Sequence, residues 1–149
     1  MATVNSTHFV DQYLPYLLAR ASAQISAQFH EQVKAAGLTV TQWRVLATLS
    51  DQTKMPVGQL AVATLTEQST LTKMLDRMQS DGLITRALCV SDKRRILISS
   101  TRAGKARVKD LLRAANLHQA ELLIPLGKER ALNLRKTLAE LIQTPKTDT

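Results

Sequence analysis

The chain has 149 residues, 44% hydrophobic and 21% charged, with a formal net charge of +8, a composition that excludes an intrinsically disordered chain. Its length suits one well-buried domain and is short for two independent cores. No apolar run approaches the roughly 20 residues that span a bilayer, the first residues lack a secretory signal, and the single cysteine cannot form an internal disulfide. We therefore expect one soluble, cytoplasmic domain spanning residues 1–149.

The positive charge is concentrated in the middle of the chain. Residues 54–109 contain eleven Lys and Arg side chains and four Asp and Glu side chains, so +7 of the net charge lies there. This concentration favours an anionic partner, either nucleic acid or an acidic membrane surface. The same stretch contains no Phe, Tyr or Trp, which argues against a membrane-lying helix and against base-stacking RNA and single-strand binders. Duplex DNA is the expected partner.

Three helices are predicted in the first part of the chain. Apolar residues recur with the helical period from residue 8 to residue 36, and Gly37 ends that helix. Thr39 or Thr41 suits the N-cap of a second helix, and Pro56 suits the first turn of a third, short helix. The predicted inward-facing residues of the second and third helices are Trp43, Val45, Leu46, Leu49, Leu60, Ala61 and Leu65.

A fourth helix is predicted to have two unlike faces. It starts with Thr66 as its N-cap and ends at the turn of residues 80–82. Its buried stripe, at helical spacing, comprises Leu71, Met74, Leu75 and Met78. The opposite face carries short polar groups and cations that suit a nucleic acid groove, namely Gln68, Ser69, Thr70, Thr72, Lys73, Asp76 and Arg77.

A β-hairpin follows this helix. Two short strands are predicted at residues 83–90 and 96–100, joined by the basic tip of residues 91–95. Helices then resume after Thr101 and past Pro125. The element order predicts a mainly α fold with a small β-hairpin wing, which is a winged helix-turn-helix. In residue numbers, the DNA-binding lobe spans 38–104 and the outer, dimerisation helices span 7–36 and 105–143.

Several segments resemble the MarR family of bacterial regulators. They are residues 69–78 of the fourth helix, residues 81–84 after it, and Asp92-Lys93-Arg94 in the wing. The last segment matches the family's Asp-x-Arg wing signature, with Arg86 six residues before it and Thr101-x-x-Gly104 after it. The sequence departs from the family pattern at residues 88–90, where many members have Pro and Asn, and at Ser100, where an apolar residue is common.

The resemblance implies a ligand-responsive repressor that acts as a homodimer on a pseudo-palindromic operator, with two recognition helices in successive major grooves and two wings at minor grooves. A narrow minor groove attracts Arg, so Arg94 is the leading minor-groove residue, with Asp92 holding it or a neighbouring Arg by a charge-assisted hydrogen bond. Lys93 and Arg95 are expected at phosphates. The full predicted DNA-binding set is Gln68, Ser69, Thr70, Thr72, Lys73, Arg77, Arg86, Asp92, Lys93, Arg94 and Arg95.

The outer helices carry the predicted dimer contacts. They hold more apolar side chains than a thin helix pair can bury against a winged domain, and a second copy would cover the remainder. The predicted interface residues are Phe9, Leu122, Leu123, Leu126, Leu138, Leu141 and Ile142.

Most aromatic residues lie near the start of the chain, which allows two interpretations. In the first interpretation, these aromatic side chains only pack in the core and at the dimer interface. The resemblance implies instead a pocket for a small anionic aromatic effector, formed by Tyr13, Tyr16 and Trp43 with Arg20 or Arg44 as the carboxylate partner. The sequence leaves both open, and it also leaves open a redox role for Cys89 in the wing.

Catalysis has little support in the sequence. His8, His30 and His118 are far apart and form no metal-ligand cluster, and the five glycines are scattered rather than gathered in a phosphate loop. We therefore expect no catalytic residues, metal or cofactor. The main alternative to a specific regulator is a nonspecific architectural DNA-binding protein, which the ratio of specific to nonspecific binding would distinguish. An enzyme on a helical scaffold is a third alternative.

Overall fold

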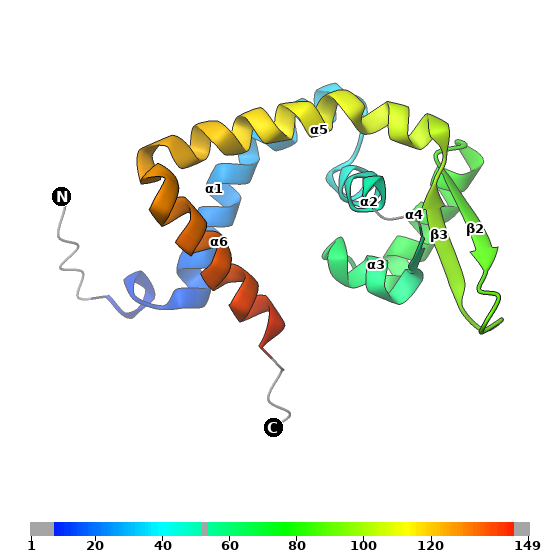
Figure 1. The fold of residues 1–149 in the computed structure, drawn as a ribbon, viewed down its shortest axis with the longest axis horizontal. Coiled ribbons are helices and arrows are strands. Elements are labelled where there is room, and N and C mark those ends of the chain that lie inside the picture. Colours follow the sequence, from blue (N-terminus) through cyan, green and yellow to red (C-terminus); the bar gives the residue numbers. More distant parts are fainter. Residues whose placement is uncertain (1–7, 52–53, 145–149) are drawn as a thin grey trace. The chain divides into compact units, whose positions relative to one another are not determined.

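The computed structural model describes residues 8–51 and 54–144. The described residues form helices and one small antiparallel sheet (Figure 1), which confirms the predicted mainly α fold with a hairpin wing. The chain divides into two compact units, residues 1–113 and 114–149. Within the described ranges, no helix is both long enough and apolar enough to cross a membrane.

The first predicted helix is divided. A single 3₁₀ turn, η1 (Phe9–Asp11), precedes the long helix α1 (Leu14–Ala35), and the Tyr13 backbone between them is extended. Pro15 accounts for the interruption, because it has no N–H to donate to the Asp11 carbonyl and its ring would clash with that carbonyl in a continuous helix. At the other end Gly37 has a φ of +76°, so it terminates the helix as expected. Residue 7, where the outer helix was predicted to begin, lies outside the described residues.

Helix α2 (Val40–Ser50) begins with a capping box. The Gln42 amide donates to Thr39 Oγ1 at 3.1 Å and the Thr39 amide donates to Gln42 Oε1 at 2.9 Å, which identifies Thr39 rather than Thr41 as the N-cap. The helix buries Val45, Leu46 and Leu49 completely, as predicted, and Trp43 partly.

Helix α3 (Val57–Ala63) is shorter than the sequence suggested. Pro56 is its N-cap with an extended backbone rather than part of its first turn, and the helix ends before Leu65. The prediction that Leu65 faces inward is wrong: its side chain is 78% exposed. Thr64 takes the buried position instead, and its hydroxyl donates to the Leu60 carbonyl at 2.7 Å.

Helix α4 (Gln68–Ser80) has the two predicted faces. Leu71, Leu75 and Met78 are fully buried, whereas Met74 is only partly buried. The predicted N-cap is wrong, because Glu67 occupies that position without a side-chain bond to the helix. The Thr66 hydroxyl donates back to the Thr64 carbonyl at 3.1 Å, so it belongs to the preceding turn.

The sheet has one more strand than predicted. Strand β2 (Ile84–Leu88) pairs with β3 (Ile96–Ser100), and β1 (Met55–Pro56) pairs with the other edge of β3 to give the order β1-β3-β2. The first hairpin strand ends two residues earlier than predicted, since Val90 lies in the loop. The Cys89 amide donates to the Arg95 carbonyl at 2.9 Å and closes the tip.

The C-terminal helices are α5 (Arg102–Leu123) and, after the 3₁₀ turn η2 (Ile124–Leu126), α6 (Gly127–Gln143). Helix α5 runs through the boundary between the two units. The first unit holds nearly all the buried apolar side chains, whereas Ala131 is the one buried residue among residues 114–144.

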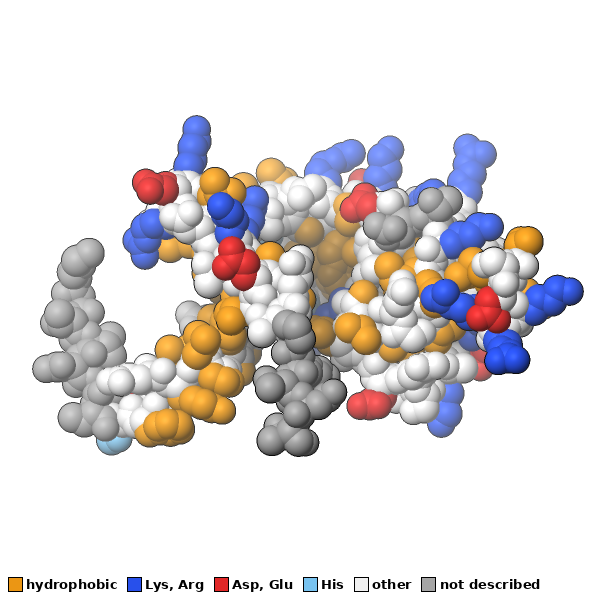
Figure 2. All heavy atoms as spheres, turned by 60° about the horizontal axis from the view of Figure 1, so that its bottom comes forward, with side chains coloured by type: hydrophobic (Ala, Val, Ile, Leu, Met, Phe, Trp, Pro, Cys, Tyr) orange, Lys and Arg blue, Asp and Glu red, His pale blue; other side chains and the backbone are white. Residues whose placement is uncertain are grey.

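Large apolar side chains remain exposed on the outer helices. Figure 2 shows hydrophobic side chains at the surface of the N-terminal arm, at its lower left. Of the predicted dimer residues, Phe9 is 75% exposed and Ile142 is 83% exposed. The others are partly buried (Leu123, Leu126 and Leu138) or exposed (Leu122 and Leu141).

Candidate nucleic-acid interface

The exposed face of α4 carries the predicted polar and basic side chains. Gln68, Ser69, Thr70, Thr72, Lys73, Asp76 and Arg77 are all exposed. The face exists because Leu71, Leu75 and Met78 fix the opposite side of the helix in the core. The Thr72 hydroxyl donates to the Gln68 carbonyl at 2.8 Å, so its proton is used within the helix and its oxygen can act only as an acceptor toward a ligand.

The wing tip is held by backbone contacts of Asp92. Its carboxylate accepts from the Arg94 amide at 3.0 Å, and its carbonyl accepts from the Arg95 amide at 3.0 Å. The carboxylate therefore caps the turn through the Arg94 backbone, and none of the ion pairs in the described part of the chain joins it to a guanidinium. Lys93, Arg94 and Arg95 are exposed and take part in none of those ion pairs. Blue side chains accordingly project around the hairpin at the right of Figure 2.

Arg86 differs from the other wing cations. It lies on β2 opposite Ile98, and its side chain is only 20% exposed. Its guanidinium donates through Nη1 to Asp76 Oδ1 at 2.7 Å and to Gln79 Oε1 at 2.9 Å, and through Nη2 to the Thr72 carbonyl at 3.2 Å. All three acceptors belong to α4, so Arg86 joins the wing to the recognition helix.

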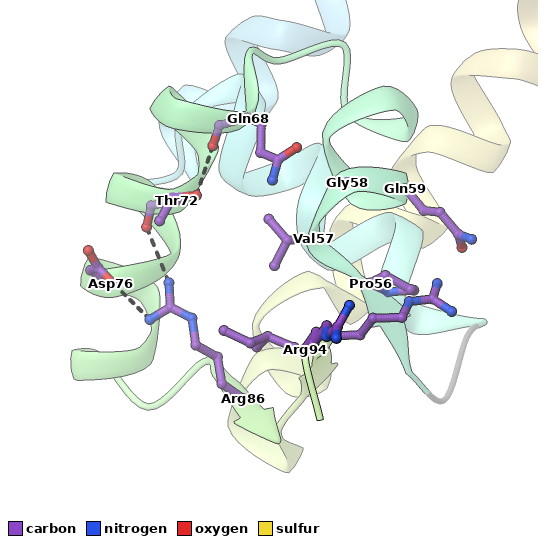
Figure 3. A pocket seen from close by; sticks show the side chains of 11 residues that line it. Pro56, Val57, Gly58, Gln59, Gln68, Thr72, Asp76, Arg86 and Arg94 are labelled. Atoms are coloured by element: carbon purple, nitrogen blue, oxygen red, sulfur yellow. Dashed lines mark hydrogen bonds and ion pairs between the residues drawn. The ribbon is translucent and has the colours of Figure 1, made fainter. Parts of the chain in front are cut away.

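A groove of about 810 Å³ lies between these elements (Figure 3). Residues of β1, α3, α4 and the wing line it: Pro56, Val57, Gly58, Gln59, Gln68, Thr72, Asp76, Arg86, Arg94, Arg95 and Ile96. The structure therefore brings five of the predicted DNA-binding residues, from two separate segments, to one concave surface. Figure 3 shows Gln68, Thr72 and Asp76 along one helix, with Arg86 reaching up to it.

The Thr-x-x-Gly segment after the wing has a structural role. The Thr101 hydroxyl accepts from the Gly104 amide at 3.0 Å and donates to the Gly82 carbonyl at 2.6 Å. Thr101 thus caps the first turn of α5 and ties it to the turn after α4. A Cβ on Gly104 would collide with the Leu83 carbonyl oxygen and the Ser100 hydroxyl, so only glycine fits there.

The five predicted effector-pocket residues form two separate groups. The Arg20 guanidinium on α1 lies 5.7 Å from the centre of the Tyr16 ring, and Tyr13, the N-cap of α1, stacks on Phe9 of η1 with ring centres 5.0 Å apart. On α2, Trp43 meets Phe29 edge-on at 5.1 Å, and Arg44 donates to the Thr64 carbonyl at 3.4 Å.

Phe29 lies thirteen positions after Tyr16 on α1, a length of about 20 Å along a helix. The Tyr16 ring and the Phe29–Trp43 pair therefore lie well apart within a single chain.

Two titratable groups near these elements have shifted pKa values. Burial, followed by the charges of Arg44 and Lys34, lowers the pKa of His30. The hydroxyl of Ser91, 3.2 Å from the Cys89 sulfur, lowers the pKa of the Cys89 thiol, and backbone hydrogen bonds from Asp92 and Ser91 add to that effect. In the described ranges, no three His, Cys, Asp or Glu side chains converge as metal ligands.

Sequence reasoning missed the acceptors of Arg86. The sequence places Asp76 on the exposed polar face without a partner for it, and it does not single out Gln79. Their spacing contained a signal, because residues 72, 76 and 79 lie on one side of a helix. The position of the wing against that side could not be read from local sequence.

This architecture defines the class of protein. A helix-turn-helix with an exposed polar recognition helix, followed by a β-hairpin whose tip is basic, is a winged helix-turn-helix. A MarR family model matches residues 38–96, described as "MarR family".

One solved structure is similar over almost its whole length. A MarR family transcriptional regulator from Silicibacter pomeroyi DSS-3 is 36% identical with a TM-score of 0.79, and the match covers 91% of this chain and 99% of that chain. The chain therefore belongs to the MarR family of transcriptional regulators.

Other similar proteins include a curated repressor and two solved structures with a bound partner. The homoprotocatechuate degradative operon repressor of Escherichia coli is 33% identical over 62% of this chain, and the match spans 63% of that protein, less than two thirds of its length. NadR, solved in complex with 4-hydroxyphenylacetate, is 25% identical with a TM-score of 0.84, covering 94% of this chain and 97% of that chain. CouR, a repressor solved on a 23-mer DNA duplex, is 25% identical with a TM-score of 0.74, covering 90% and 95%.

Proposed function

We propose that this MarR-family regulator binds duplex DNA sequence-specifically as a homodimer and represses transcription. The observation that carries the proposal is the single concave surface on which the exposed polar face of α4 meets the unpaired cations Arg94 and Arg95 of the wing. The DNA-bound structure of CouR, which has a similar fold, supports a duplex as the partner.

Each part of this surface suits one feature of B-DNA. The major groove admits an α-helix and displays a distinct donor and acceptor pattern for each base pair. Gln68, Ser69 and Lys73 near the start of α4 supply both donors and acceptors at that level. The minor groove concentrates negative potential where it is narrow, and Arg94 at the wing tip is the side chain we assign to it.

The test of the interface begins with selection of genomic fragments by the purified protein. For the selected duplex, Arg94→Ala is expected to weaken binding by about 1 to 3 kcal/mol and to reduce the preference for A·T-rich flanks. Arg113→Ala is the matched control, since it removes the same charge from an exposed site on α5 that does not line the groove. Equal losses in both variants would contradict the assignment of Arg94.

The alternative function is a nonspecific architectural DNA-binding protein. It would use the same charges without reading bases, and its affinity would depend on salt just as steeply. A specific regulator is expected to prefer its selected duplex by about 10³-fold or more over unrelated sequence at matched salt. A ratio near one would favour the architectural protein.

We also propose a small aromatic carboxylate as effector, supported by the complex of NadR with 4-hydroxyphenylacetate. Of the two residue groups, we favour the one on α2, where Trp43 packs edge-on against Phe29 and the charge of Arg44, the next residue in the chain, acts on the partly buried His30. A guanidinium pairs with a carboxylate through two parallel hydrogen bonds, and an indole stacks on an aromatic ring.

Trp43 is the only tryptophan of the chain, so its fluorescence reports on this group alone. Titration with 4-hydroxyphenylacetate is expected to quench it saturably and to release the selected duplex. Arg44→Lys should weaken both effects, because an ammonium cannot form the paired hydrogen bonds. Arg20→Lys is the matched control on the other group. A loss confined to Arg20→Lys would move the site to α1.

A further inference from the structure

Arg86 is a cation of the wing whose side-chain hydrogen bonds, within the described part of the chain, are all made to residues of α4. Its guanidinium contacts Asp76, Gln79 and the Thr72 carbonyl, at distances of 2.7 to 3.2 Å. Figure 3 shows this side chain crossing from the strand to the helix. Its charge is neutralised by a carboxylate at hydrogen-bond distance, in contrast to Arg94 and Arg95. A phosphate would have to displace that carboxylate to reach it.

The Asp76 carboxylate is otherwise hard to explain on this face. Its side chain is 65% exposed, and it shares the face with Thr72 and Lys73 in a protein that we propose to bind a polyanion. An unpaired acid there would repel phosphates. Paired with Arg86, it instead supplies a charge-assisted bond between two elements.

These contacts join the two elements that carry the proposed DNA-reading side chains. Arg86 lies on the strand that leads to the wing tip, and its acceptors occupy three positions along α4, at residues 72, 76 and 79. A planar guanidinium bonded at three points holds one orientation better than a single bond does. The angle between the recognition helix and the wing is thereby set before DNA arrives, which reduces the ordering cost of binding.

We propose that Arg86 is a positioning residue for sequence-specific binding and not a phosphate contact: it fixes the wing relative to α4 through Asp76 and Gln79. The proposal rests on the proposed function, since it explains how the recognition helix and the wing contact one operator together. It assigns to Arg86 a role different from that of Arg94 and Arg95, although all three are cations of the wing.

The test uses two substitutions that separate charge from geometry. Arg86→Lys retains the positive charge but cannot reach three acceptors, whereas Arg86→Met removes the charge and keeps much of the volume. Both are expected to weaken binding of the selected duplex about tenfold and to leave nonspecific binding within about twofold. The slope of log affinity against log salt is expected to stay unchanged, whereas loss of a phosphate contact reduces its magnitude by about one.

Asp76→Asn is expected to change DNA affinity in opposite directions, depending on whether Asp76 acts as a repelling charge or as the acceptor of Arg86. If Asp76 acted only as a repelling charge, its removal would strengthen binding to every duplex. As the acceptor of Arg86, its removal is expected to weaken binding of the selected duplex and not of unrelated DNA. Arg95→Met serves as the comparison for a free wing cation, and its salt slope is expected to fall.

A measurement without DNA keeps this inference separate from the proposed function. In thermal unfolding, the double variant Asp76→Asn with Arg86→Met is expected to have a Tm no lower than that of the less stable single variant, because both substitutions remove the same Arg86–Asp76 ion pair. Additive shifts in Tm would show that Arg86 and Asp76 do not interact, and would overturn the proposed contact between the wing and α4. The positioning role alone would be overturned if Arg86→Met lost affinity for the selected duplex and had a reduced salt slope, while Arg86→Lys kept wild-type affinity. A wild-type protein without sequence preference would overturn the proposed function and this role with it.

Discussion

Leu65 is the one non-glycine residue with a positive φ, +55°, in the part of the chain that the structure describes. In this left-handed conformation the Cβ of an L-residue approaches the following carbonyl oxygen too closely, which costs roughly 1 to 2 kcal/mol. The side chain does not offset that cost by burial, since it is largely exposed. The strain comes from the tight turn between α3 and α4.

We expect Leu65→Gly to be more stable than Leu65→Ala by about 1 kcal/mol, because only glycine lacks the Cβ that causes the strain. Both substitutions remove the same exposed apolar side chain, so their difference isolates the backbone term. Chemical denaturation of the two variants measures it. Equal stability would mean that the turn adjusts to accept an alanine.

His30 is expected to make the fold sensitive to mild acid. Burial and the nearby cations Arg44 and Lys34 lower its pKa in the folded chain, so the unfolded chain takes up the proton first as the pH falls. Stability is therefore complete above the unfolded value of about 6.5 and declines as the pH falls from there toward the folded pKa.

His30→Gln should remove this part of the acid sensitivity. The loss in free energy of unfolding between about pH 7.5 and about pH 5.5 is expected to be smaller in the variant than in the wild type. Urea denaturation at both pH values gives the comparison. An equal loss in the two proteins would show that other groups govern the acid response.

At the scale of elements, the two faces of helix α4 have different expected roles: the buried face stabilises the fold and the exposed face contacts DNA. Leu75 is fully buried, and truncation of a buried leucine to alanine costs about 2 to 5 kcal/mol. Leu75→Ala is therefore expected to lower Tm and to weaken DNA binding only through unfolding.

Lys73→Ala, on the exposed face two residues away, is the matched comparison. It should change stability by less than about 0.5 kcal/mol and alter which duplexes are selected. Thermal melts and fragment selection on both variants check the pair. A Leu75→Ala protein that is as stable as the wild type but selects other duplexes would show that the two faces of α4 are assigned the wrong way round.

Sequence reasoning was most successful where local chemistry decides the outcome. The stripe of Leu71, Leu75 and Met78 and the stop at Gly37 were predictable, because helical periodicity and left-handed glycine caps act within a few residues. The N-cap of α2 was predictable to within two candidates, Thr39 and Thr41, of which the structure selects Thr39. Most of the fold follows from such signals.

It failed where tertiary contacts decide. Strand β1 is only Met55 and Pro56, and nothing in two residues marks them as a strand until β3 lies beside them. From the sequence, the Thr66 hydroxyl could accept from an amide of α4 or donate to the preceding turn, and in the structure it donates to the Thr64 carbonyl. The candidate site followed the same division: the exposed residues of α4 were predictable from period, whereas the partners of Arg86 depend on how the wing packs.

At the scale of the whole molecule, the outer helices leave too much apolar surface exposed for a soluble monomer. The exposed large apolar side chains of the second unit are Leu117, Leu122, Ile124, Leu132, Leu134, Leu141 and Ile142. We expect a symmetric dimer whose interface exceeds about 2,000 Å², and an operator with half-sites about one helical turn apart.

Sedimentation equilibrium of the full chain, and of a chain truncated after Ala120, tests this expectation at micromolar concentration. Ile142→Glu should weaken association because it places a charge in the expected interface, whereas Val62→Glu, equally exposed on α3, should leave association unchanged. A monomeric full-length protein, or a truncated chain that still dimerises, would rule out the outer helices as the interface.

Among residues 114–144 Ala131 is the one buried residue, which has a consequence for how such a regulator would respond to its own abundance. If a second copy supplies the missing core, folding of these helices and pairing of subunits are one equilibrium, and thermal stability rises with protein concentration. Below the dissociation constant of the dimer, the occupied fraction of operator grows with the square of subunit concentration. A modest fall in synthesis would then empty the operator more sharply than a monomeric repressor could, without any effector.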